Sequence, residues 1–85
     1  MTHEIKLLEE FCKPVDNGDK TFEVRLNDRN YSVGDYVKFI PWDGKANKES
    51  KKFQTIKKTI YEITYILSGW GLQDGYVAFS IEPLF

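Results

Sequence analysis

The chain has 85 residues, of which 41% are hydrophobic, 29% charged and 15% aromatic, and its net charge is −1. This length allows one small domain over residues 1–85, the composition excludes a disordered chain, and the single cysteine excludes an internal disulfide or a multi-cysteine zinc site. No signal-peptide pattern opens the sequence and no apolar stretch approaches the roughly 20 residues of a membrane span, so we expect a cytoplasmic protein with no membrane partner and no metal.

Two elements are predicted before the first turn. Residues 3–8 alternate between apolar and polar side chains, which is typical of a strand with His3, Ile5 and Leu7 on one face. A histidine in that position is either a buried or barrel-mouth residue or a catalytic base. Residues 9–17 predict a short helix, because two glutamates at its start suit the positive end of the helix dipole and a proline limits its length.

Residues 21–26 are the clearest strand of the sequence, because apolar and polar side chains alternate there without a break. We assign the three apolar side chains to the core, which turns Glu23 and Arg25 outward or into a cleft. In that register Lys20 and Arg25 contribute little to stability, about 1 kcal/mol or less together, as exposed ion pairs do. Polar turns separate this strand from the next one, over residues 36–41.

The second half of the chain predicts a polar, lysine-rich loop and two further strands. The loop covers residues 42–54, and residues 55–67 form a long strand in which a change of apolar phase indicates a β-bulge. A glycine-rich loop at residues 68–75 leads to a final strand over residues 76–81. We expect the inward side chains of all strands to form one core, which includes Phe22, Val24, Val37, Phe39, Ile63, Val77 and Phe79.

These elements together predict an α+β fold. Five or six short strands with one helix near the N-terminus suit a small, mostly antiparallel sheet that closes into a barrel. The predicted bulge agrees with closure, because a bulge bends and twists a strand as a barrel requires.

Four motifs follow one another along the chain. His3 and Lys6 fit H-x-x-K, residues 18–29 fit G-x-K-x-F-E-x-R-x-N-D-R, residues 33–35 read V-G-D, and residues 71–76 read G-L-x-D-G-Y. With these motifs in this order the chain resembles the ASCH domain family of the PUA-like superfamily, and more closely a small bacterial and phage subfamily of unknown function. The resemblance implies a PUA-like mixed, mostly antiparallel β-barrel with one short helix near the N-terminus. It also implies a cleft beside that helix, lined by the motif Lys, Glu and Arg, that binds RNA or modified bases.

One branch of the ASCH family resembles an amidohydrolase that acts on N4-acetylcytidine, with a Thr nucleophile three residues after the motif Lys. In this chain that position holds Glu23, and Thr21 stands only one residue after Lys20. A carboxylate there repels a developing oxyanion and supplies no hydroxyl nucleophile. We therefore expect little or no deacetylase activity, and if the protein is an enzyme, Lys20, Thr21 and Glu23 are its catalytic candidates.

The candidate ligand-binding residues are charged or aromatic. Glu23 and Arg25 lie two apart on one strand, so they form either a pair that reads a base edge or a phosphate, or a plain salt bridge. Six lysines lie between residues 43 and 58, where they attract phosphate or only keep the chain in solution. Trp70, between two glycines, is a candidate for stacking on a base. The predicted ligand-binding set is Lys20, Glu23, Arg25, Arg29, Lys51, Lys52 and Trp70.

Three functions are open at this point. The leading hypothesis is a monomeric module that binds RNA or a nucleotide and needs no cofactor. The first alternative is a small amidohydrolase that acts on a modified nucleoside such as N4-acetylcytidine. The second alternative is a protein-interaction domain with no role in nucleic-acid binding.

Overall fold

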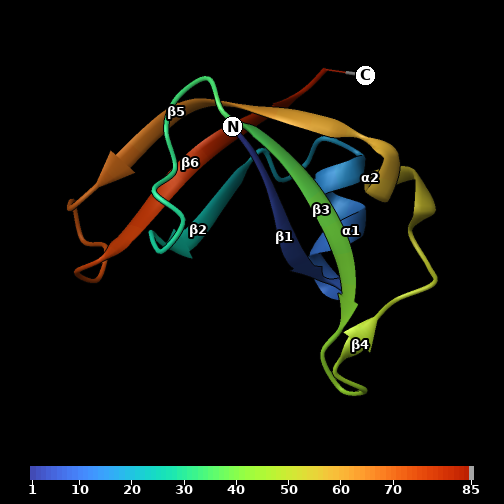
Figure 1. The fold of residues 1–85 in the computed structure, drawn as a ribbon. Helices are drawn as coiled ribbons and strands as arrows, with labels where there is room; N and C mark the ends of the chain where they lie inside the picture. Colours follow the sequence, from blue (N-terminus) through green and yellow to red (C-terminus); the bar gives the residue numbers. More distant parts are fainter. Residues whose placement is uncertain (85) are drawn as a thin grey trace.

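Six strands and two helices make up residues 1–84, the part of the chain that the computed structural model describes (Figure 1). Their order is β1 (Thr2–Leu8), α1 (Glu9–Asp16), β2 (Phe22–Leu26), β3 (Tyr36–Asp43), β4 (Lys48–Glu49), α2 (Gln54–Lys58), β5 (Ile60–Ser68) and β6 (Tyr76–Pro83). The predicted α+β class and the helix near the N-terminus are confirmed. The helix α2 corrects the prediction of a strand from residue 55 onward. No helix in this part of the chain is both long and apolar enough to cross a bilayer.

All six strands belong to one open sheet. Five of them lie in the order β1-β3-β5-β6-β2, and β4 pairs with the C-terminal end of β3. β1 and β3 are parallel, whereas the other pairs are antiparallel. β1 and β2 are therefore the two free edges, and no backbone ladder joins them within the described residues. The predicted barrel is wrong, because closure requires these two edges to pair.

The hydrophobic core lies between the inner face of the sheet and the two helices. Both helices lie near β1 and β3 (Figure 1), and they contribute Cys12, Val15 and Ile56 to the core. Burial raises the pKa of the Cys12 thiol to about 11, so the sulfur is a protonated core atom and not a nucleophile. Five of the predicted core residues are buried as expected, namely Val37, Phe39, Ile63, Val77 and Phe79.

The strand β5 contains a bulge, but not where the sequence predicts one, after Ile60. The register against β6 shifts between Ile63 and Tyr65. Ile63 is fully buried before the shift, whereas Tyr65 is 63% exposed after it. The shift turns the side chains of the last part of β5 to the opposite faces of the sheet, so Ile66 packs against the core.

The strand β2 is turned over relative to the prediction. Phe22 and Val24 are each 48% exposed, whereas Glu23 is only 3% exposed and lies opposite the buried Phe79 on the inner face. The register assigned from the sequence, with the apolar side chains inward, is therefore wrong for this strand. The physical reason is its place at the edge of the sheet, where the inner face of β2 meets the gap to β1 and partners for a charge are within reach.

Candidate functional site

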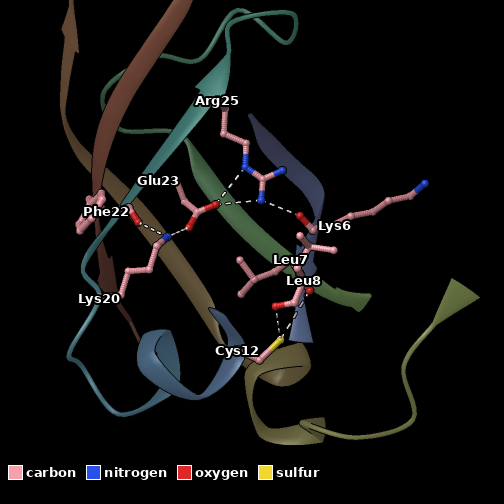
Figure 2. A network of polar contacts seen from close by, with 8 residues as sticks. All are labelled: Lys6, Leu7, Leu8, Cys12, Lys20, Phe22, Glu23 and Arg25. Atoms are coloured by element: carbon pink, nitrogen blue, oxygen red, sulfur yellow. Dashed lines mark hydrogen bonds and ion pairs between the residues drawn. The ribbon is translucent and has the colours of Figure 1, made fainter. Parts of the chain in front are cut away.

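Glu23 holds two cations at the inner face of β2 (Figure 2). One carboxylate oxygen pairs with the Lys20 ammonium, and the other accepts hydrogen bonds from Arg25 Nε at 2.9 Å and Arg25 Nη2 at 2.8 Å. Lys20 Nζ also donates to the Phe22 carbonyl at 2.7 Å. A buried carboxylate costs several kcal/mol without partners, so these two cations are a condition for placing Glu23 inside the fold.

Arg25 spans the two free edges of the sheet. Its Nη2 donates to the backbone carbonyl of Lys6 on β1 at 2.6 Å, as Figure 2 shows. One arginine side chain thus occupies the place where a closed barrel would have a ladder of backbone hydrogen bonds. Its remaining amino group, Nη1, has no hydrogen-bond partner among the residues that the structure describes.

A cleft lies between the two edges, and Arg25 contributes to both of its pockets. The first pocket has a volume of about 420 Å³ and is lined by Lys6, Leu8, Phe11, Lys20, Phe22, Glu23, Val24, Arg25, Leu26 and Tyr76. The second has a volume of about 320 Å³ and is lined by Lys6, Arg25, Leu26, Asp28, Arg29 and Tyr31. Each pocket carries three cations against one carboxylate; the first adds six apolar or aromatic side chains, whereas the second adds only Leu26 and Tyr31.

The aromatic and cationic side chains of the cleft lie close to one another. Lys20 Nζ lies 5.2 Å from the ring centre of Phe11 and 5.0 Å from that of Phe22. Burial raises the pKa of the Tyr31 hydroxyl, while Arg25 and Arg29 act against this increase through their positive charge. The first pocket therefore combines π faces with a cation, and the second is electropositive around Tyr31.

The structure brings together only part of the predicted ligand-binding set. Lys20, Glu23, Arg25 and Arg29 all line the cleft. Lys51 and Lys52 line a separate hollow of about 290 Å³ beside Glu9 and Asp43. Trp70 is 88% exposed in the loop between β5 and β6 and lines neither pocket of the cleft.

The three residues suggested for an amidohydrolase do not share one pocket. Thr21 lines a cavity of about 380 Å³ that also includes Lys20, Tyr61 and Ile81 but not Glu23. Both oxygens of Glu23 are already engaged by Lys20 and Arg25. No group of three His, Cys, Asp or Glu side chains among residues 1–84 is placed to hold a metal ion.

Two cleft residues were not singled out as ligand-binding candidates. Lys6 comes from β1 and Phe11 from α1, so both reach the cleft from the side opposite β2. Lys6 is exposed on the outer side of its strand, and its ammonium lies 4.0 Å from the ring centre of Trp42. The only signal in the sequence is the position of Lys6 three residues after His3, and Phe11 has no comparable signal.

A second polar cluster joins the ends of β1 and β3. His3 Nε2 and Asp35 Oδ2 are 2.8 Å apart, and the buried His3 ring meets the edge of Tyr31 at a centroid distance of 4.8 Å. The histidine is thus a buried, hydrogen-bonded residue, the first of its two predicted roles. The hydrogen bond to His3 lowers the pKa of the Asp35 carboxyl, and the Ser32 amide and the N-terminal ammonium lower it further.

The lowered pKa of Asp35 predicts an acid-dependent contribution to stability. A carboxylate whose pKa is lower in the folded state stabilises the fold above its ordinary pKa of 3.8, and this contribution is lost as the pH falls through the lowered value. Asp35→Asn is therefore expected to have a lower melting temperature than the wild type at neutral pH. The difference between the two melting temperatures is expected to narrow at about pH 2.5. Thermal melts of both proteins at the two pH values measure it.

Asp19→Asn is the matched control, because the Asp19 side chain makes no hydrogen bond or ion pair with the described residues. It should melt with the wild type at neutral pH. A gap between Asp35→Asn and the wild type that is equally wide in acid would contradict the proposed role of the Asp35 charge.

Comparison with known sequences and structures assigns the family. The sequence profile of a family described as "Domain of unknown function (DUF3850)" matches residues 2–81. The chain belongs to the DUF3850 family. No curated protein gives a significant match to this DUF3850 domain. The ASCH resemblance is not part of this assignment and stays a prediction.

Two solved structures share the fold of this DUF3850 domain. The crystal structure of hypothetical protein PH0355 superimposes with a TM-score of 0.64 at 21% identity, over 99% of this chain and 100% of that chain. The solution NMR structure of protein PF0455 from Pyrococcus furiosus gives a TM-score of 0.51 at 22% identity, over 99% of this chain and 98% of that chain. At these identities the likeness concerns the fold alone.

Proposed function

We propose that this DUF3850 domain binds a nucleotide, free or within an RNA, in the cleft between β1 and β2. The observation that carries the proposal is the position of Arg25 in the lining of both pockets, with one amino group that has no partner among residues 1–84. Glu23 and the Lys6 carbonyl fix the rest of the guanidinium, so little side-chain entropy is lost when a ligand binds.

The two pockets suit the two halves of a nucleotide. The rings of Phe11 and Phe22 in the first pocket offer faces on which a base can stack, an interaction worth about 1–3 kcal/mol. Arg25 and Arg29 in the second pocket offer guanidinium groups that match a phosphate, which accepts charge-assisted hydrogen bonds from such forks. Lys20 lies at the aromatic end, where its ammonium can meet the polar edge of a base.

The family resemblance supports the same ligand class. The ASCH resemblance implies a cleft lined by Lys20, Glu23 and Arg25 and associated with RNA or modified bases, and these three side chains do form one contact network. In this proposal Glu23 positions Lys20 and Arg25 and does not contact the ligand itself. The exposed Lys51 and Lys52 add only an unspecific attraction, because they lie outside the cleft.

Arg29→Ala is expected to weaken binding of nucleoside 5′-monophosphates about tenfold and to leave binding of the matching nucleosides unchanged. A charge-assisted hydrogen bond is worth about 1.5–3 kcal/mol, and only the phosphorylated ligand can make it with Arg29. Titrations followed by amide chemical shifts measure both affinities, with the four common nucleotides, their nucleosides and short single-stranded RNAs as ligands.

Lys51→Ala is the control with the same loss of one positive charge at a position outside the cleft. Its affinity for a mononucleotide should stay within a factor of two of the wild type. Equal losses of affinity in Arg29→Ala and Lys51→Ala would show that the binding is only general electrostatic attraction. If no nucleotide or RNA shifts the amides of residues that line the cleft, the proposal is wrong.

A further inference from the structure

On the side of β2, β6 and β5 that points away from the core, two complete rows of side chains across the three strands carry no charge. One row runs Phe22–Ser80–Tyr65 across the three strands, and the next runs Val24–Ala78–Leu67. Leu26 and Tyr76 continue the pattern as a third pair. We call these positions the outer face. Both helices lie near β1 and β3, so neither covers it (Figure 1).

The outer face exposes an unusual amount of apolar surface for a chain of this size. Leu26 is half exposed like Phe22 and Val24, and Tyr65 is exposed still further. With aromatic side chains that each present about 150–250 Å² when fully accessible, the face exposes on the order of 500 Å² of apolar surface. That is at the upper end of the largest patches on monomeric proteins, about 300–600 Å², which are often interaction sites.

The chemistry of the face points to a second copy of the same chain as its partner. An isologous dimer requires one patch that is complementary to itself, and an uncharged apolar patch meets its own copy without repulsion. At one end of the face the Lys20 ammonium lies 5.0 Å from the ring centre of Phe22, whereas the rows themselves carry no charge. The pair Glu62 and Glu82 marks where the apolar rows end, so the patch has a polar rim on one side, as interfaces commonly do.

We propose that the domain forms a two-fold dimer through the outer face, with the two sheets packed against each other. Sheets that pack face to face lie about 10 Å apart with interdigitated side chains, which suits the Phe22, Val24 and Tyr65 positions. The available area lies below the roughly 800 Å² per partner of a standard interface, so the dimer is weak and reversible. It replaces the monomer expected from the sequence. Phe22, Val24, Leu26 and Tyr76 also line the first pocket of the cleft, so the dimer and a nucleotide bound there as proposed above compete for these side chains.

The test is sedimentation of the protein between about 5 and 500 μM, where a weak dimer changes its population. The average mass is expected to rise from the monomer value of 10.0 kDa toward twice that value. Val24→Lys places a charge in the central row and should weaken dimerisation at least tenfold. Val33→Lys is the matched control, because Val33 is equally apolar and exposed but lies in the loop before β3, outside the face.

A measurement without mutation keeps the test decisive if Val24→Lys fails to fold. Amide chemical shifts of the wild type are expected to change with concentration in β2, β5 and β6 and to stay constant in α2 and β4, which contact β3 and lie away from the face. A wild type that stays monomeric at about 500 μM overturns the proposal. Concentration-dependent shifts confined to other surfaces, or equal effects of Val24→Lys and Val33→Lys, overturn it as well.

Discussion

Replacing Phe39 with alanine is expected to cost about 3–5 kcal/mol of the free energy of unfolding, whereas Phe22→Ala should cost about 1.5 kcal/mol or less. The Phe39 ring is 1% exposed and meets the edge of Tyr61 at a centroid distance of 5.2 Å, so its loss leaves a cavity in the centre of the core. The Phe22 ring is on the outer face and leaves no closed cavity behind. Urea unfolding of both variants, followed by far-UV circular dichroism, measures the difference.

The comparison is matched, because both changes remove the same side chain from a strand of the same sheet. A domain of this size has a total stability of about 4–13 kcal/mol, so Phe39→Ala removes a large part of it. If Phe22→Ala is as destabilising as Phe39→Ala, then the apolar side chains of β2 face the core and the register with Glu23 inward is wrong.

The orientation of the central strands was predictable, because the alternation of apolar and polar side chains along each strand agrees with which of its faces is buried. β3 and β6 pair on both edges and bury one face in the core, so the apolar side chains of each strand mark its inner face correctly. Val37, Phe39, Val77 and Phe79 follow this rule. The bulge of β5 was not visible in the same way: the change of apolar parity comes after Ile56, which lies in α2, and Ile60, whereas the register shifts between Ile63 and Tyr65.

The orientation of β2 could not be read in the same way. Alternation defines two faces of a strand but does not say which of them is buried, and the apolar face is the usual choice. Here the inner face holds Glu23, whose charge is compensated by Lys20 and Arg25, and Arg25 also reaches the carbonyl of Lys6, a residue 19 positions away in the sequence. Whether the edges of a sheet close into a barrel depends on the same long-range geometry.

The candidate site was predictable only where its residues are neighbours in the sequence. Lys20, Glu23 and Arg25 belong to one motif that begins just before β2 and continues along it, and the structure brings them together. Phe11 and Lys6 come from the other side of the gap, and nothing local connects them to that motif. The lysines after Asp43 formed the strongest charge cluster of the sequence, yet their loop lies elsewhere, and Lys57 is paired with Glu49.

The double variant Lys20→Ala/Arg25→Ala is expected to lose about 3–5 kcal/mol of the free energy of unfolding, far more than the 1 kcal/mol expected for exposed charges. The reason is the carboxylate that the two cations leave behind. Glu23 is almost completely buried, and both of its oxygens have no other partners among the described residues. Urea unfolding at neutral pH measures the loss.

A third substitution separates the cost of the unpaired Glu23 carboxylate from the cost of the contacts that Lys20 and Arg25 no longer make. Glu23→Met in the double variant replaces the carboxylate by an apolar side chain of similar length, and replacing a buried ion pair by apolar groups is often neutral. The triple variant is therefore expected to recover at least half of the lost stability. It should still bind nucleotides poorly, because its cleft lacks Lys20 and Arg25. A double variant within about 1 kcal/mol of the wild type would contradict the buried network. A triple variant no more stable than the double one would show that the lost contacts, and not the unpaired carboxylate, are the cost. The motif is thus expected to serve two purposes through one residue: Glu23 makes the fold depend on the same two cations that the proposed ligand requires.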